Sequence, residues 1–89
     1  MSNNRSLHDF HAMIVRLDQR RVRLELECDM AHQEWKDSYD SYGRPINADP
    51  NIAHNAFNHW TECIENLNET VQAIALLHKI ADKIEKRLD

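Results

Sequence analysis

Helix-breaking residues are confined to one short segment of this chain. Its only glycine, Gly43, and its two prolines, Pro45 and Pro50, all lie between residues 43 and 50. Glycine and proline are the strongest local breakers of regular secondary structure. Long uninterrupted stretches lie on both sides of this segment, so the sequence predicts two long elements joined by one loop.

The first stretch has the pattern of an amphipathic helix. Its apolar residues fall within about 100° of a helical wheel, and Ser6 with Asp9 resembles a capping box. A strand over residues 22–28 is the alternative, because apolar and charged residues alternate there. We favour a helix, since the segment is rich in good helix formers and contains no turn. The stripe consists of Phe10, Met13, Ile14, Leu17, Leu24, Cys28, Ala31 and Trp35.

The second stretch begins at Asp49-Pro50, where Asp can cap a helix and Pro suits the first helical position. Folding the chain about its loop brings together residues whose numbers sum to about 91, such as Leu24 with Leu67. Apolar residues meet apolar residues along most of this pairing. The sequence therefore predicts an all-α fold, a single-domain antiparallel hairpin over residues 1–89, with helices at about 6–40 and 50–88 and a loop at 41–49.

Apolar residues outside the pairing stripe predict a protein partner. An isolated hairpin would leave them in water, and exposed apolar stripes of this length usually mark an interface. A homodimer that closes a four-helix bundle is the simplest solution, and a different partner chain is the alternative. The residues concerned are Val15, Val22, Leu26 and Met30 in the first helix and Leu76, Ile80 and Ile84 in the second.

Aromatic residues gather near the loop end of the predicted hairpin. They can form a core for that end of the hairpin, or they can anchor a partner, because Trp and Tyr dominate binding hot spots. Both interpretations stay open from the sequence. The candidate anchors are Trp35, Tyr39, Tyr42 and Trp60.

Cysteine and histidine recur with mirror-image spacing. Cys28 and His32 are four residues apart, as are His59 and Cys63, and residues four apart share a helix face. In the predicted hairpin the four side chains could converge on a zinc ion. Cysteines packed as small apolar groups, or a Cys28–Cys63 disulfide, are the alternatives. We favour packed cysteines and expect no metal and no cofactor.

Composition and motifs argue against several classes of function. The net charge of −4 repels phosphate, so we expect no direct binding of nucleic acid. The longest apolar run, residues 73–77, is too short to cross a membrane, which takes about 18 residues. A single glycine cannot build a phosphate-binding loop, and no motif of a known catalytic class is present. We expect a chain that is not an enzyme.

The first six residues are polar and lack the apolar stretch of a signal peptide. A cytoplasmic location is therefore the expectation, with export that needs no cleaved signal as the alternative.

The layout resembles the WXG family of small secreted helical hairpins, with Trp35 in the position of the family's Trp. The chain departs from that pattern because Lys36-Asp37 follows, without the Gly, and because the family's Tyr-x-x-x-Asp/Glu tail is absent. The turn over residues 47–50 also resembles that of type III secretion needle subunits. The WXG resemblance implies a self-assembling or secreted hairpin of a bacterial secretion system.

Taken together, these patterns favour a protein that binds another protein stoichiometrically. An adaptor, or a small inhibitor of the kind that phages encode, fits an acidic helical surface with exposed apolar strips. The WXG-like hairpin and a zinc-stabilised Cys/His module are the alternatives.

Overall fold

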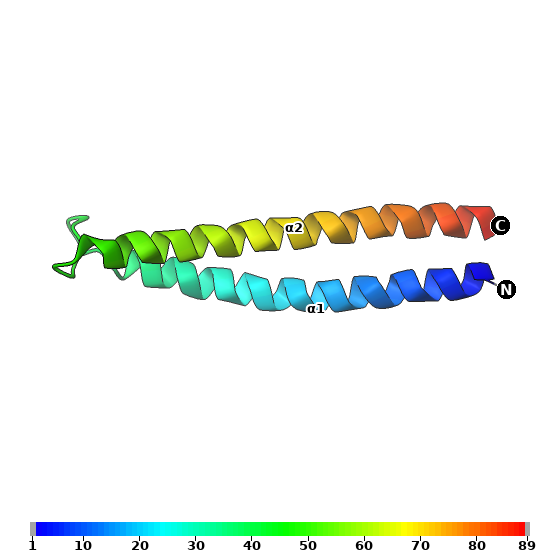
Figure 1. Ribbon diagram of the computed structural model, residues 1–89, viewed down its shortest axis with the longest axis horizontal. Coiled ribbons are helices and arrows are strands. Elements are labelled where there is room, and N and C mark those ends of the chain that lie inside the picture. Colours follow the sequence, from blue (N-terminus) through cyan, green and yellow to red (C-terminus); the bar gives the residue numbers. More distant parts are fainter. Residues whose placement is uncertain (1, 89) are drawn as a thin grey trace. The chain divides into compact units, whose positions relative to one another are not determined.

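A computed structural model describes residues 2–88, and the side chains of residues 7–87. Helix α1 spans Ser2–Lys36 and helix α2 spans Pro50–Leu88, and the two helices pack against each other as a hairpin (Figure 1). The predicted all-α hairpin is therefore confirmed. Two compact units divide the chain: unit 1 contains Met1–Val22 and Asn68–Asp89, and unit 2 contains Arg23–Leu67.

Helix α2 begins where the sequence predicts. The Asp49 carboxylate accepts a hydrogen bond from the Asn51 backbone N–H at 3.0 Å, which satisfies one of the free N–H groups at the helix start. Pro50 occupies the first helical position, where a missing N–H costs nothing. At the other end, Lys86 and Arg87 lie in the last turn, where positive charge interacts favourably with the helix dipole.

Helix α1 begins at Ser2, four residues before the predicted start at residue 6, so Ser6 lies inside the helix and the capping-box interpretation is wrong. The helix ends at Lys36, four residues before the predicted end at residue 40. The Ser38 hydroxyl donates to the Glu34 carbonyl oxygen at 2.9 Å, and the Ser38 backbone N–H donates to the Trp35 carbonyl oxygen at 3.1 Å. These bonds tighten the last turn and use carbonyl groups that a longer helix would occupy. Residues 22–28 lie inside α1, so the strand alternative is wrong.

The loop between the helices, residues 37–49, is an ordered turn. Tyr39 and Pro45 form an isolated antiparallel bridge, and the Asp40 carboxylate accepts hydrogen bonds from the backbone N–H groups of Tyr42 and Arg44, each at 2.9 Å. Gly43 has a φ of +77°, a conformation that side-chain-bearing residues rarely adopt. The loop is thus fixed by its own hydrogen bonds and by one glycine.

The core of unit 2 lies where the two helices meet around the cysteines. Small residues allow the helices to approach closely there, and larger apolar side chains cover them. Leu24, at 7% exposure, is the largest buried apolar side chain among the described residues. The cluster consists of Cys28, Ala31 and Cys63, with Trp60, Ile64 and Leu67 packed against it.

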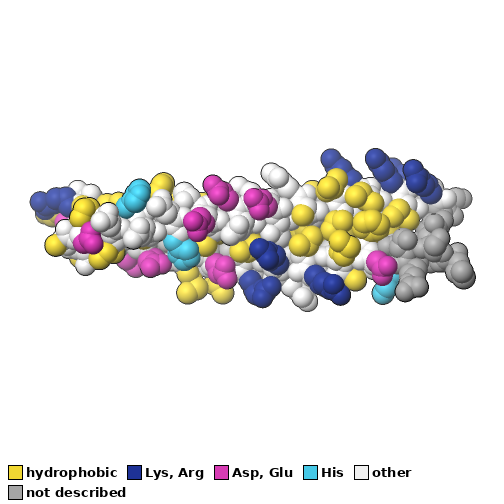
Figure 2. Space-filling model, in the orientation of Figure 1, with side chains coloured by type: hydrophobic (Ala, Val, Ile, Leu, Met, Phe, Trp, Pro, Cys, Tyr) yellow, Lys and Arg dark blue, Asp and Glu magenta, His cyan; other side chains and the backbone are white. Residues whose placement is uncertain are grey.

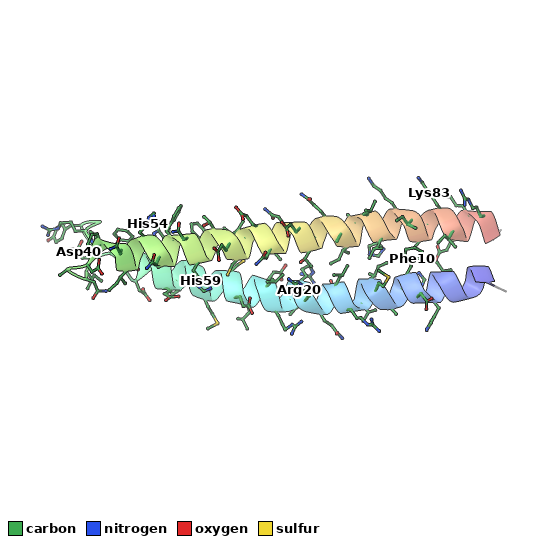
Figure 3. All side chains as sticks on the ribbon, viewed as in Figure 1. Phe10, Arg20, Asp40, His54, His59 and Lys83 are labelled. Carbon is green, nitrogen blue, oxygen red and sulfur yellow. The ribbon has the colours of Figure 1, made fainter. Side chains whose placement is uncertain are left out.

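The core of unit 1 is thinner. Among its described side chains only Thr70 and Ala81 are buried. Phe10 points from α1 towards α2 (Figure 3) but is only half-buried, as are Ile14 and Leu77. Unit 1 therefore leaves much of its apolar surface in contact with water. Figure 2 shows hydrophobic side chains gathered over unit 1.

No helix within residues 2–88 combines the length and the apolarity that crossing a membrane requires.

Candidate functional site

The α1 strip predicted from the sequence consists of Val15, Val22, Leu26 and Met30. All four side chains are exposed, from 53% for Val22 to 65% for Met30. Since neighbouring strip residues are seven or four positions apart, they follow one side of the helix. We call this strip of exposed apolar side chains the α1 strip, and it is a candidate binding surface.

The candidates at the C-terminal end of α2 differ in exposure. Leu76 is 58% exposed, whereas Ile80 and Ile84 are half-buried. All three lie in unit 1, where few side chains are buried. A partner could therefore still cover a substantial part of each.

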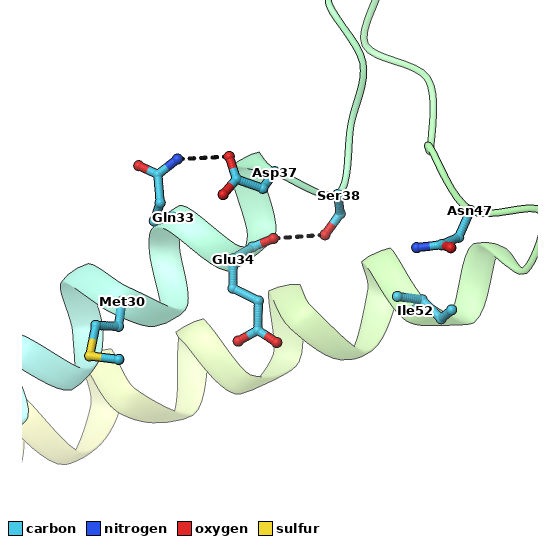
Figure 4. A pocket seen from close by; sticks show the side chains of 7 residues that line it. All are labelled: Met30, Gln33, Glu34, Asp37, Ser38, Asn47 and Ile52. Carbon is cyan, nitrogen blue, oxygen red and sulfur yellow. Dashed lines mark hydrogen bonds between the residues drawn. The ribbon is translucent and has the colours of Figure 1, made fainter.

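A groove of about 610 Å³ opens on unit 2 beside the loop (Figure 4). Its apolar side chains are Met30 from α1 and Ile52 from α2, and both are exposed. Its charged side chains are Glu34 and Asp37, both acidic. We call it the acidic groove, and it is lined by Met30, Gln33, Glu34, Asp37, Ser38, Asn47 and Ile52.

The two carboxylates of the acidic groove are held in place by neighbours that carry no permanent positive charge. The Asp37 carboxylate accepts a hydrogen bond from the Gln33 side-chain amide at 2.8 Å (Figure 4), and a Glu34 carboxylate oxygen lies 3.7 Å from Nδ1 of His59. Neither Lys nor Arg is among the lining residues. The groove therefore presents negative charge next to apolar side chains, which suits an amphipathic cationic ligand.

A second hollow, of about 270 Å³, extends this surface onto α2. It shares Glu34, Ser38 and Ile52 with the acidic groove and adds Asn55, Ala56 and His59. The extension is lined by short polar and apolar side chains.

The loop presents a further exposed group. Tyr42 is 80% exposed, and the Arg44 guanidinium lies 5.2 Å from the centre of its ring. Ile46 is also exposed. Tyr and Arg are enriched at binding hot spots, and the Asp40 hydrogen bonds hold this pair ready, which lowers the entropy that binding would cost.

The remaining aromatic candidates pack against one another. Trp35 and Trp60 stack with ring centres 5.0 Å apart, Tyr39 meets Trp35 edge-on at 6.1 Å, and all three are half-buried. Phe57 contacts both Trp rings. These contacts agree better with aromatic residues that form a core at the loop end of the hairpin than with residues that anchor a partner.

The two cysteines are buried next to each other as free thiols. Burial raises the pKa of both the Cys28 and the Cys63 thiol above the ordinary value of 9.0, and the negative charge of Glu27 raises both further. The thiols therefore stay protonated at neutral pH. Because the thiolate is the reactive form, they are poor nucleophiles.

The two histidines of the mirror-image motif take different neighbours. His32 stacks on Trp60 with ring centres 4.5 Å apart, whereas His59 lies beside Glu34. Within residues 2–88, no group of three or more Cys, His, Asp or Glu side chains is arranged to hold a metal ion. Each histidine therefore contacts a different residue of the opposite helix, and the four side chains of the motif do not converge on one point.

The acidic groove was not predicted from the sequence. Its walls combine residues from three segments: the end of α1, the loop and the first turn of α2. The only signal in the sequence is that Glu34 and Asp37 are three residues apart and share a helix face. That spacing places the two carboxylates on one face of the chain. It does not indicate which residues of the loop and of α2 form the other walls of the groove.

Comparison of the chain with models of protein families, with curated proteins and with solved structures gives no match.

Proposed function

We propose that this chain is a non-enzymatic protein-binding module that acts stoichiometrically, as an adaptor or as a small inhibitor of a larger protein. The observation that carries the proposal is the α1 strip of Val15, Val22, Leu26 and Met30, with every side chain more than half exposed. Apolar strips of this kind are costly in water, at about 25 cal/mol per Å² of apolar area. A partner that covers the strip would gain this free energy.

Two further features support a protein as the ligand. The ordered loop presents Tyr42 and Arg44, which are residue types that often dominate protein interfaces. The hollows on unit 2 are open and shallow rather than enclosed, whereas small-molecule sites usually bury most of their ligand. A helical or extended protein segment fits such a surface better than a small substrate does.

Affinity capture with three tagged baits tests the proposal. The first bait is the wild-type chain, and the second is V22E/L26E, which places two charges on the α1 strip. The third is the matched control N68E/Q72E, which adds the same two charges, also four residues apart, at exposed positions of α2. Mass spectrometry then identifies and quantifies the proteins that each bait retains.

We expect one protein to be retained at about one copy per chain by the wild type and by N68E/Q72E, and to be lost from V22E/L26E. Titration calorimetry with that protein, once purified, should give a stoichiometry of one site per chain. The proposal is wrong if the wild type retains only itself, or if V22E/L26E retains the same proteins in the same amounts. Far-ultraviolet circular dichroism must show that all three baits are equally helical.

A further inference from the structure

Charge is unevenly distributed between the two units. Unit 1 contains eight Lys or Arg and six Asp or Glu, whereas unit 2 contains three Lys or Arg and nine Asp or Glu. With His neutral, the net charges are +2 for unit 1 and −6 for unit 2, which together give the −4 of the whole chain. Unit 2 of one molecule therefore attracts unit 1 of another, while two copies of unit 2 repel each other.

The positive charge of unit 1 borders an apolar strip on α2. Leu76, Ile80 and Ile84 are four residues apart and follow one side of the helix. Lys83 points away from α1 (Figure 3), and Figure 2 shows apolar side chains of unit 1 bordered by Lys and Arg. We call this segment the basic strip, and it consists of Leu76, Lys79, Ile80, Lys83, Ile84 and Arg87.

The acidic groove of unit 2 is the chemical complement of the basic strip. Exposed apolar side chains, Met30 and Ile52, would meet the apolar side of a helix. Glu34 and Asp37 would meet its Lys and Arg side chains. An amphipathic helix laid in an apolar groove is a common mode of recognition between proteins, and opposite charges at the edge fix its orientation and register.

The exposed area of the chain is large enough for such a contact. The chain exposes 7008 Å², whereas a compact monomer of 10.5 kDa is expected to expose about 5,400 Å². The excess is about 1,600 Å² per chain. A standard interface covers about 800 Å² per partner, so one interface of that size would remove only part of the excess.

We propose that the acidic groove binds the basic strip of a second copy of this chain, in a two-fold symmetric, antiparallel dimer. Symmetry repeats the contact, because the strip of the first copy lies in the groove of the second and the reverse holds too. The antiparallel sense follows from the charges, since a parallel dimer would place two units of net charge −6 together. This inference concerns self-association and does not depend on the protein partner proposed above.

Zero-length cross-linking with a carbodiimide tests the contact directly. A carbodiimide joins a Lys amine to a carboxylate only where the two groups touch, and a mixture of ¹⁴N-labelled and ¹⁵N-labelled chains shows which cross-links join different molecules. We expect mixed-isotope cross-links from Lys79 or Lys83 to Glu34 or Asp37. Sedimentation equilibrium should show a dimer at low salt that weakens as salt is added, because salt screens exposed charges.

Charge reversal separates this contact from a general effect of net charge. We expect E34K/D37K to raise the dimer dissociation constant on the order of tenfold or more, since it converts attraction into repulsion at both symmetric sites. Adding K79E/K83E to E34K/D37K restores complementary charges and should bring the constant back towards the wild-type value. The matched control D29K/E65K makes the same charge change at exposed residues of unit 2 outside both hollows, and it should weaken the dimer far less.

Three results would overturn the proposal. The first is a strict monomer at 100 μM protein and low salt. The second is a set of intermolecular cross-links that join unit 1 to unit 1 or unit 2 to unit 2. The third is a dimer dissociation constant that D29K/E65K and E34K/D37K raise equally and that does not return towards the wild-type value when K79E/K83E is added to E34K/D37K. Circular dichroism of each variant confirms that the helices remain intact.

Discussion

The indole rings of Trp35 on α1 and Trp60 on α2 stack almost in parallel, with centres 5.0 Å apart and planes inclined by 12°. Phe57 lies against both rings, at 5.6 Å from Trp35 and 6.0 Å from Trp60. Aromatic pairs of this kind contribute about 0.5–1.5 kcal/mol beyond the area that they bury. The stack therefore joins the two helices of unit 2 close to the loop.

Replacing Trp60 with alanine should lower the free energy of unfolding by about 2–3 kcal/mol. A fully buried Trp would cost somewhat more, but this ring is half-buried. W60F keeps an aromatic ring in the stack, so it should lose clearly less. Urea unfolding followed by circular dichroism at 222 nm measures both values, and equal losses for W60A and W60F would show that the stack adds nothing specific.

Much of the fold could be predicted because the chain concentrates its breakers. With Gly43, Pro45 and Pro50 in one segment, the loop and the start of α2 after Asp49 could be placed, whereas α1 begins and ends about four residues earlier than predicted. The end of α1 could not be predicted to the residue. It depends on whether the Glu34 carbonyl bonds within the helix or to the Ser38 hydroxyl, and such local competition leaves no periodic signal.

The candidate site was predictable only in part. Helical periodicity sufficed to identify the exposed strip, because residues such as Val22 and Leu26 fall outside the pairing face. The acidic groove depends on how the loop places Asn47, which lines the groove together with Glu34 and Ile52. Rotation of each helix about its axis decides side-chain neighbours, which is why Cys28 meets Cys63 as predicted whereas His32 meets Trp60.

The loop should open when Asp40 is replaced. The Asp40 carboxylate accepts hydrogen bonds from two backbone N–H groups and pairs with the Arg44 guanidinium at 3.5 Å. D40A leaves those donors to water, so we expect a loss of about 1 kcal/mol in stability and faster amide exchange at Tyr42 and Arg44. S41A, at the neighbouring exposed position, should change neither. Unchanged exchange in D40A, measured by nuclear magnetic resonance, would contradict this account of the loop.

The cysteine pair should make the chain less stable at alkaline pH. Burial raises the pKa of both thiols above 9.0, so the folded state holds its thiol protons more tightly than the unfolded state. Well below pH 9 both states are protonated, and the thiols do not change the stability. As the pH rises further, the unfolded state loses its protons first and folding becomes less favourable. The loss stops once the pH exceeds the folded-state pKa of the thiols.

The variant C28A/C63A isolates this contribution. Wild type and variant share every other titrating group, so the difference between their curves of unfolding free energy against pH belongs to the thiols. The wild-type curve should fall more steeply above pH 9. Parallel curves between pH 7 and pH 10, measured by urea unfolding, would rule out the expected change in thiol protonation.

Leu24 and Leu26 provide a matched comparison of core and interface within one turn of α1. Leu24 is 7% exposed and Leu26 is 61% exposed. L24A should destabilise the chain by about 3 kcal/mol, since it leaves a cavity in a packed region. L26A should change stability by less than about 0.5 kcal/mol but should weaken binding of the proposed protein partner. If L26A destabilised the isolated chain as much as L24A does, the α1 strip would belong to the core.

Unit 1 should open more readily than unit 2 when the chain is dilute and therefore monomeric. Local stability follows the number of buried apolar contacts. Only Thr70 and Ala81 are buried among the described side chains of unit 1, whereas unit 2 contains the Cys28, Ala31 and Cys63 cluster.

We expect amides of residues 10–20 and 74–84 to exchange on the order of ten times faster than those of residues 28–31 and 60–64. Mass spectrometry after deuterium labelling at 1 μM measures this ratio. Labelling at 100 μM should slow exchange across residues 74–84 if a second copy covers the basic strip. Uniform protection at 1 μM would instead mean that the two units unfold together.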